Sequence, residues 1–238
     1  GDAEAVRVGR ADREEQAMTE PYYSDELVTL YHGDCRDVVA DLPSGASVVT
    51  DSPYGVGLAY DEHDDSEENL RDLIGALAPI LLNGDSHGVF TGVQNFSLWP
   101  RPRWTLCWIE PAGTRSGPWG FSTWQPIAAY GPDPFLATGR GRRPDTFRTA
   151  ATSAKNEKAL HGTGDHPCPK PISVMTWAVE RITLPTATVV DPFAGSGSTL
   201  VAAKRLGRKA IGVELSERYC EIAAKRLAQG VLDFGGAS

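Results

Sequence analysis

Hydrophobic and polar positions along the chain follow two alternating periods. Short apolar runs have the length of buried strands, and between them apolar residues recur every three or four positions, which is the spacing of an amphipathic helix. The alternation of strand and helix predicts an α/β fold with a doubly wound, mostly parallel sheet. The strands are predicted at 27–31, 47–51, 88–91, 187–191 and 209–213, and the helices at 36–42, 68–82, 172–182, about 199–206 and 216–227.

The middle of the chain departs from this pattern. Two more apolar runs, 103–109 and 127–130, are typical of strands, but the segment between them is rich in Gly, Trp and Pro, and residues 131–165 show no sustained periodicity. A long irregular stretch inside a compact domain is usually functional or disordered. We therefore predict one domain over residues 21–238 that carries an irregular insertion at 111–165.

Two further segments need an interpretation. Residues 1–20 are polar, lack periodicity and are predicted to be a flexible leader. Within the insertion, Trp119, Phe121 and Trp124 are predicted to be core side chains, with stacking on nucleic-acid bases as the alternative.

Composition narrows the class of protein. The 238 residues are 41% hydrophobic and 23% charged, as in soluble globular proteins, and no apolar run is long enough for a membrane span. The N-terminal stretch lacks the apolar core of a signal peptide, so we predict a cytoplasmic protein. Its four cysteines are too far apart for a disulfide framework or a metal knuckle. His161, His166 and Cys168 form a local group, but flanking prolines place it in a loop, and no metal site is predicted.

The charge is unevenly distributed. The formal net charge of -8 argues against a uniformly basic coat for a polyanion. Acidic residues concentrate in 1–25 and 61–85, whereas residues 139–170 hold seven basic residues against three acidic ones. A charge run is usually a solvated face, yet a basic loop in an acidic protein is also a candidate nucleic-acid contact. The basic residues are Arg140, Arg142, Arg143, Arg148, Lys155, Lys158 and Lys170.

The stretch TDSPYG at 50–55 places a carboxylate, Asp51, at the end of a predicted strand. Open α/β sheets bind ligands at that edge, although Asp, Ser and Pro are also ordinary turn residues. A second stretch, VVDPFAGSGSTL, ends a strand at Asp191 and continues through Gly195 and Gly197 into a helix. Glycines allow a tight turn, and the helix offers free N–H groups to a ligand. Glu214, at the end of the following strand, is suited to binding ribose hydroxyls.

Together, DSPYG, HPCPKP at 166–171 and DPFAGSGST resemble the S-adenosylmethionine-dependent DNA amino-methyltransferases, which have a Rossmann-like fold. The catalytic motif precedes the cofactor motif, an order that resembles the β class. The resemblance covers roughly residues 27–230, and it makes residues 21–238 a methyltransferase domain with the insertion at 111–165 as its candidate target-recognition region. It implies S-adenosylmethionine as cofactor and double-stranded DNA as partner, and it leaves a homodimer and a partner restriction nuclease open.

The resemblance also assigns roles to residues. The catalytic residues would be Asp51, Ser52, Pro53 and Tyr54, and the cofactor residues would be Asp34, His166, Lys170, Asp191, Phe193, Gly195, Ser196, Gly197 and Glu214. Asp34 would meet the adenine end, Glu214 the ribose, and Lys170 the methionine carboxylate. The alternative for Lys170 is an exposed lysine in contact with solvent.

The chemistry of the DSPY motif explains the choice of residues. An exocyclic amino group is a poor nucleophile because its lone pair is delocalised into the ring, and two acceptors that bind its protons would localise that lone pair. Asp51 would supply one acceptor and the carbonyl of Ser52 or Pro53 the other, while Tyr54 would stack on a base rotated out of the duplex. The leading Asp51 resembles the motif of the adenine-N6 group, and this resemblance favours adenine N6 as the target. Cytosine N4 is the first alternative, and a methyltransferase acting on RNA, protein or a small molecule is the second.

Overall fold

The computed structural model describes residues 20–38, 42–58, 60, 62–110, 115–149 and 169–229. Almost all of the predicted leader lies outside these ranges, as do Lys155, Lys158 and the group His161, His166 and Cys168.

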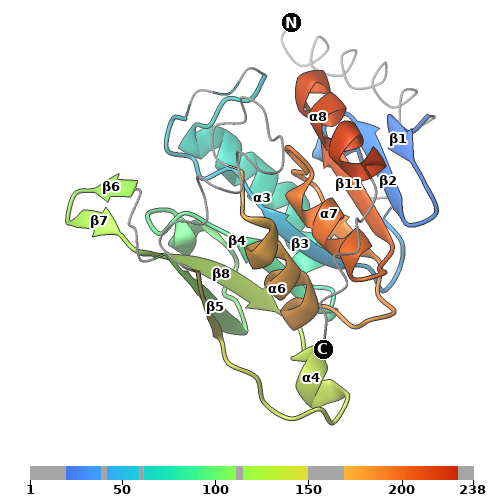
Figure 1. Cartoon of the computed structure of the whole chain (residues 1–238). Helices are drawn as coiled ribbons and strands as arrows, with labels where there is room; N and C mark the ends of the chain where they lie inside the picture. Colours follow the sequence, from blue (N-terminus) through green and yellow to red (C-terminus); the bar gives the residue numbers. More distant parts are fainter. Residues whose placement is uncertain are drawn as a thin grey trace, which may run out of the picture.

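Within the described residues, the chain builds one large sheet and one small one (Figure 1). The large sheet has the order β1-β2-β11-β10-β3-β4-β8-β5-β9. The five central strands, from β2 to β4, are parallel, whereas β1, β8 and β5 pair in antiparallel fashion with their inner neighbours. The strands are β1 Tyr23–Ser24, β2 Val28–His32, β3 Ser47–Asp51, β4 His87–Phe90, β5 Trp104–Ile109, β8 Trp124–Tyr130, β9 Thr146–Arg148, β10 Val189–Asp191 and β11 Ala210–Glu214.

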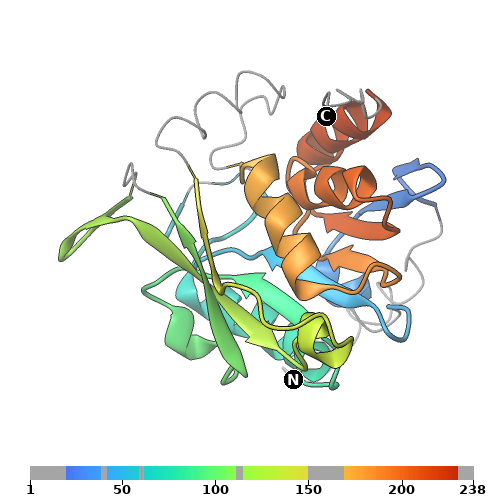
Figure 2. The same cartoon turned by 60° about the horizontal axis from the view of Figure 1, so that its bottom comes forward.

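Helices cover both faces of the parallel part. Successive strand residues point to opposite faces, so that Val48 and Val190 belong to one core cluster and Val49 and Val189 to the other. The predicted doubly wound α/β fold is thus confirmed, and Figure 2 shows α6, α7 and α8 on one side of the sheet and α3 on the other. The helices are α2 Cys35–Val38, α3 Glu67–Leu81, η2 Phe96–Leu98, α4 Pro134–Ala137, α6 Ile172–Ile182, α7 Ser198–Arg205 and α8 Glu217–Ala228. None of the helices in the described ranges has the length and apolar composition needed to cross a bilayer.

The predicted helices and strands agree with the structure to within two or three residues, because local periodicity decides them. Local signals also set the helix starts: the Ser66 hydroxyl accepts a hydrogen bond from the backbone N–H of Asn69, and α6 begins directly after Pro171. The helix predicted at 36–42 forms at its start as α2, and residues 39–41 lie outside the described ranges. Two short elements, α4 and β9, lie in the stretch that showed no periodicity.

The topology fixes where a ligand site belongs. From β10 the chain passes through α7 to β11 on one side, and from β3 it passes through α3 to β4 on the other side, although β10 and β3 are neighbours. Connections that leave adjacent strands in opposite directions open a crevice at the carboxyl ends of those strands. Asp51 ends β3 and Asp191 ends β10, so both predicted motifs reach this crevice.

The small sheet is a hairpin of β6 Arg115–Gly117 and β7 Gly120–Ser122, which protrudes from the body of the molecule (Figure 1). The prediction of core aromatics in this region is wrong: the exposed fraction is 101% for Trp119, 76% for Phe121 and 45% for Trp124. Periodicity within a strand cannot reveal whether another layer will cover it, and here the hairpin extends beyond the helices.

Candidate active site

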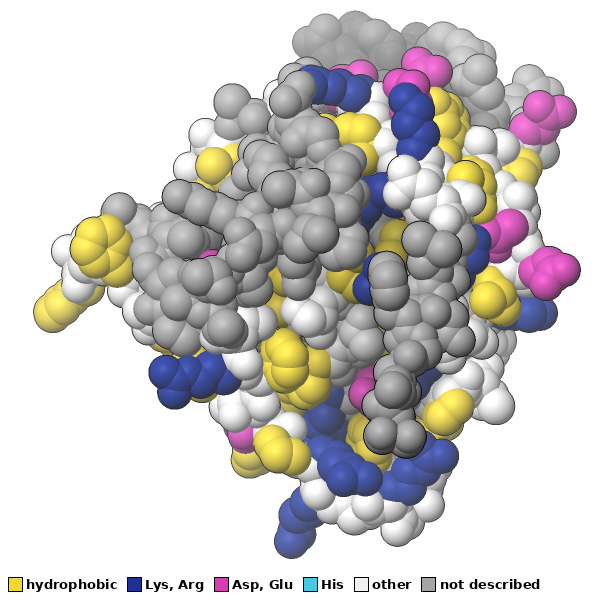
Figure 3. Space-filling view, viewed as in Figure 1, with side chains coloured by type: hydrophobic (Ala, Val, Ile, Leu, Met, Phe, Trp, Pro, Cys, Tyr) yellow, Lys and Arg dark blue, Asp and Glu magenta, His cyan; other side chains and the backbone are white. Residues whose placement is uncertain are grey.

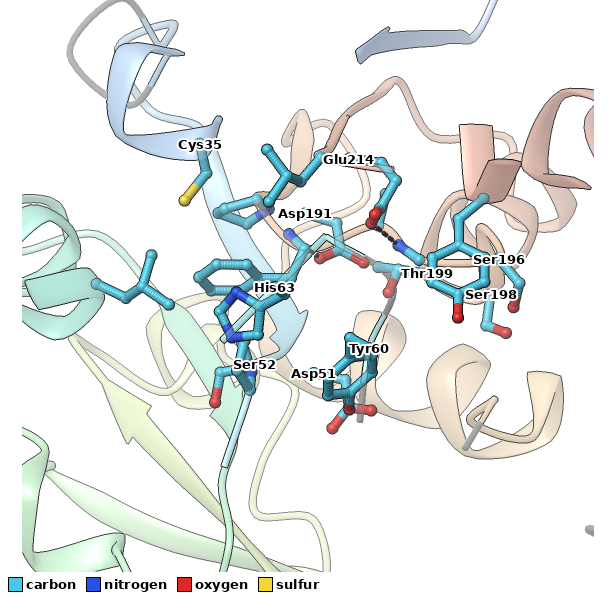
Figure 4. Close-up of a pocket in the computed structure, with 18 of the residues that line it drawn as sticks. Cys35, Asp51, Ser52, Tyr60, His63, Asp191, Ser196, Ser198, Thr199 and Glu214 are labelled. Atoms are coloured by element: carbon cyan, nitrogen blue, oxygen red, sulfur yellow. Dashed lines mark hydrogen bonds between the residues drawn. The ribbon is translucent and has the colours of Figure 1, made fainter. Parts of the chain in front are cut away.

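The crevice between β3 and β10 collects the predicted catalytic and cofactor residues in one open cleft. Figure 4 shows Asp51, Asp191 and Glu214 around the same pocket, although they end three different strands. The predicted residues that line it are Asp34, Asp51, Ser52, Pro53, Tyr54, Lys170, Asp191, Phe193, Gly195, Ser196 and Glu214. Gly197 does not line the cleft, and His166 lies outside the described residues.

Asp51 is the centre of a compact hydrogen-bond cluster. The Tyr54 hydroxyl donates to Asp51 Oδ1 at 2.7 Å, and Lys170 Nζ donates to Asp51 Oδ2 at 2.6 Å and to the Tyr54 hydroxyl at 3.0 Å. Gln125 Nε2 also donates to that hydroxyl. Both carboxylate oxygens are therefore held in place, and each keeps a lone pair for a further donor.

Lys170 has a different partner from the one that the resemblance implied. Its side chain is 4% exposed, so the alternative of a solvated lysine is wrong, and its ammonium forms an ion pair with Asp51. A methionine carboxylate in the same cleft would compete with Asp51 for this ammonium. Pairing of Lys170 with the cofactor stays a prediction.

The backbone of the DSPY loop is held in place by the clamp of Asp65 and Asn95, two residues that no sequence motif marks. Asp65, 2% exposed, accepts four backbone N–H bonds from residues 54, 55, 56 and 58, at 2.7 to 3.1 Å. On the other side, Asn95 Nδ2 donates to the carbonyls of Tyr54 and Gly55 at 2.8 and 3.1 Å. Gly55 has φ +66°, and a Cβ there would lie 2.9 Å from the Leu70 side chain.

The clamp leaves the required acceptors available. The Ser52 hydroxyl is turned away from the base site and donates to the Phe90 carbonyl at 2.9 Å. In the described part of the chain, the carbonyls of Ser52 and Pro53 accept no hydrogen bond from a protein donor. Ser52 and Pro53 line the cleft together with Asp51, so the carbonyl of either residue is a candidate acceptor.

On the cofactor side, two buried carboxylates shape the glycine turn. Glu214 Oε2 accepts from the Gly195 N–H at 2.7 Å and Oε1 from the Ser216 N–H at 2.9 Å, and burial raises its pKa. Asp191 accepts from the Thr50 hydroxyl at 2.5 Å and from the Phe193 N–H at 3.1 Å. Burial raises the pKa of Asp191 to about 6.

Of the remaining predicted residues, Asp34 lines the cleft, whereas Gly197 shapes the turn before α7. Asp34 lies at the far end of the cleft, where it forms an ion pair with Arg36 at 2.5 Å. Gly197 has φ +80°, and a Cβ there would lie 2.9 Å from the Ala223 side chain. Gly197 thus lets α7 pack closely on α8 at the start of α7, and its predicted cofactor contact stays a prediction.

The described basic residues of the stretch 139–170 lie in different places, and of these Lys170 lines the cleft. Arg142 and Arg143 line a second cavity together with His87, Tyr130 and Trp104, at the opposite end of β5 and β8 from the cleft. Arginine side chains gather there around α4, at the bottom of Figure 3. Arg148 ends β9 next to Ile109 and lies at the edge of the sheet that bears the cleft.

Comparisons with known proteins agree with this geometry. Residues 91–225 match the model of the N6/N4 DNA methylase family. The chain is 32% identical to the protein YubD of Escherichia coli (strain K12) over 210 residues, which cover 82% of this chain and 88% of YubD. It is 24% identical to the type II methyltransferase M.ScaI of Streptomyces caespitosus, over 89% of this chain and 85% of that protein.

Solved structures show the same fold. The PvuII DNA methyltransferase, which is cytosine-N4-specific, aligns with a TM-score of 0.65 at 17% identity, over 92% of this chain and 91% of that one. The complex of M1.HpyAVI with S-adenosylmethionine aligns with a TM-score of 0.61 at 20% identity, over 84% of this chain and 99% of that one.

Proposed function

Because the chain belongs to the N6/N4 DNA methylase family, we propose that it transfers a methyl group from S-adenosylmethionine to the exocyclic amino group of a base in double-stranded DNA, with adenine N6 as the target. One observation carries the proposal. Asp51 and the glycine turn at Gly195 are 144 positions apart in the sequence but line one cleft. A nucleophile held at Asp51 and a methyl donor held at the turn would therefore meet.

The residues of the cleft suit this chemistry. An amino group that donates one hydrogen bond to Asp51 and one to the carbonyl of Ser52 or Pro53 becomes more tetrahedral, and its lone pair is freed for attack. Asp51 also stabilises the positive charge that develops on the attacking nitrogen. Because Tyr54, Lys170 and the Asp65 clamp already fix the loop, little reorganisation remains when a base arrives.

The opposite half of the cleft suits S-adenosylmethionine, which carries ribose hydroxyls, a sulfonium and a carboxylate. The carboxylates of Asp34 and Glu214 line it, and the turn at Gly195 leads into α7, whose first N–H groups have no partner within the helix and favour a carboxylate. We propose that Glu214 holds the ribose, Asp34 the adenine end, and Phe193, Gly195 and Ser196 the methionine part. When bound, S-adenosylmethionine supplies an electrophilic methyl group on a sulfonium.

The leading Asp51 favours adenine over cytosine. A motif that begins with Asp resembles the motif of the adenine-N6 enzymes, whereas a leading serine is commoner among the cytosine-N4 enzymes. Ser52 in place of the first proline keeps cytosine N4 as the alternative.

Two measurements test the proposal. DNA from a host that expresses the chain is sequenced by a method that distinguishes N6-methyladenine from N4-methylcytosine, and methyl transfer by the purified protein is measured on duplex DNA and on RNA. We expect N6-methyladenine at one sequence context. N4-methylcytosine would reject the adenine assignment, and methyl incorporation into RNA but not DNA would reject the DNA substrate.

Variants then separate the two halves of the cleft. Asp51→Ala is expected to lose methyl transfer while its affinity for S-adenosylmethionine, measured by calorimetry, changes less than about threefold. Asp72→Asn, on the exposed face of α3, is the matched control and retains activity. Equal losses of cofactor affinity and activity in Asp51→Ala would contradict the division of roles.

A further inference from the structure

The β6–β7 hairpin exposes aromatic side chains that the fold does not use. Trp119 lies in the turn between the two strands and is fully exposed, and Phe121 on β7 is 76% exposed. Yellow side chains at the far left of Figure 3 mark this hairpin. Exposed aromatic rings that cluster on a projection indicate a binding surface, because burying them against a partner is strongly favourable.

The hairpin projects from the edge of the sheet that bears the catalytic cleft. Since β8 is antiparallel to β4 and pairs Ile127 with Phe90, the first residues of β8 lie at the same edge as Asp51. Gln125, near the start of β8, donates to the Tyr54 hydroxyl. Trp119 lies six positions before Gln125, a length of chain that spans at most about 20 Å when extended.

The chemistry of the hairpin favours bases over phosphates. Apart from Arg115 at the start of β6, the hairpin contains no charged residue, and its tip, SGPWGFS at 116–122, has none, whereas surfaces that bind phosphates are rich in Lys and Arg. A two-stranded ribbon fits the major groove, which is roughly 12 Å wide and 8.5 Å deep. Aromatic side chains stack on bases or insert between base steps. Pro118 fixes one turn dihedral and Gly120 adopts φ +111°, so Trp119 is presented by a well-defined turn.

We propose that the β6–β7 hairpin is a DNA-contacting arm that enters the groove beside the target base, with Trp119 stacked on the bases there. The inference rests on the proposed function and adds the surface that contacts the base stack. Trp119 then contributes to the affinity for duplex DNA and not to the affinity for the cofactor.

The experiment compares two exposed tryptophans, Trp119 in the hairpin turn and Trp104 at the end of β5 that lies away from the cleft. Trp119→Ala is tested beside Trp104→Ala, because Trp104 is 62% exposed but lies at the end of β5 away from the cleft. Duplex affinity is measured by fluorescence anisotropy at several salt concentrations, with S-adenosylmethionine affinity and thermal unfolding as controls. Trp119→Phe tests whether any aromatic ring suffices.

We expect Trp119→Ala to weaken duplex binding about 5- to 100-fold, the range found when one stacking side chain is removed. The slope of log affinity against log salt should stay unchanged, because no phosphate contact is lost. Trp119→Phe should recover most of the affinity, and Trp104→Ala should match the wild type.

Three results would overturn the inference. The first is wild-type duplex affinity in Trp119→Ala, and the second is an equal loss of affinity in Trp104→Ala. The third is a changed sedimentation coefficient of Trp119→Ala without DNA, which would show that the hairpin contacts a second copy of the chain. These failures leave the proposed function intact if the wild-type protein still methylates DNA. Absence of DNA methylation by the wild type would instead remove the premise.

Discussion

Replacing Asp65 with Asn tests whether one buried carboxylate holds the catalytic loop. The substitution preserves shape but turns one acceptor oxygen into an NH2 group, so two of the four backbone N–H groups lose their acceptor. An unsatisfied buried donor costs about 1–3 kcal/mol. Val56 and Leu58 are 45% and 38% exposed, so their N–H groups reach water more easily, and the amide should orient its oxygen toward the other two.

The expected loss of stability is therefore about 2–4 kcal/mol, at the lower end of the sum for two donors. For a chain of this size, about 2–4 °C of melting temperature correspond to each kcal/mol, so we expect a fall of about 4–15 °C in calorimetry. Methyl-transfer kcat should fall more than the affinity for S-adenosylmethionine, because Asp65 holds only the Asp51 half of the cleft.

Asp64→Asn is the matched control. The Asp64 carboxylate is exposed, and it accepts a hydrogen bond from the Ser66 hydroxyl and not from the loop backbone. If Asp65→Asn melted within about 2 °C of the wild type with unchanged kcat, the loop would not depend on this carboxylate.

Further substitutions test other parts of the structure. Gly197→Ala forces an L side chain to φ +80° against Ala223, so we expect a loss of about 1–3 kcal/mol in denaturant unfolding; wild-type stability would refute the close packing. His87 is buried, and desolvation lowers its pKa to about 4 because it disfavours the cation; the neutral ring accepts from the Val48 N–H through Nδ1 and donates from Nε2 to Asn83 Oδ1. Because unfolded histidine titrates near 6.5, this contribution is present above pH 6.5 and is lost as pH falls toward 4; His87→Gln should flatten the curve of unfolding free energy against pH over that window. Lys170→Met removes the ammonium that donates to Asp51 and to the Tyr54 hydroxyl, so the kcat of methyl transfer should fall, and an unchanged kcat would contradict a positioning role for Lys170.

The local parts of this protein could be predicted from sequence. Strand and helix periodicity, the proline that opens α6 and the glycine turn after β10 depend on residues within a few positions of one another. Asp51 was placed at a strand end for the same reason, and family motifs added the roles of residues around it.

Contacts between distant segments could not be predicted in this way. Asp65 stood in an acidic run that resembled an ordinary solvated loop, and Gln125 and Asn95 carried no motif, yet each donates to or accepts from the DSPY loop. The contact between Lys170 and Asp51, which are 119 positions apart, likewise has no local signal.

Sequence by itself determined the class of fold, the ends of the central strands and the turns at which a ligand can approach, because short-range sterics and periodicity set them. Only the tertiary structure decided that β3 lies beside β10, that Asp65 is buried beneath the loop and that Trp119 is exposed on a projecting arm. The reason is physical: strand order and burial depend on how layers pack across the whole chain, and no local pattern encodes which surfaces another layer will cover.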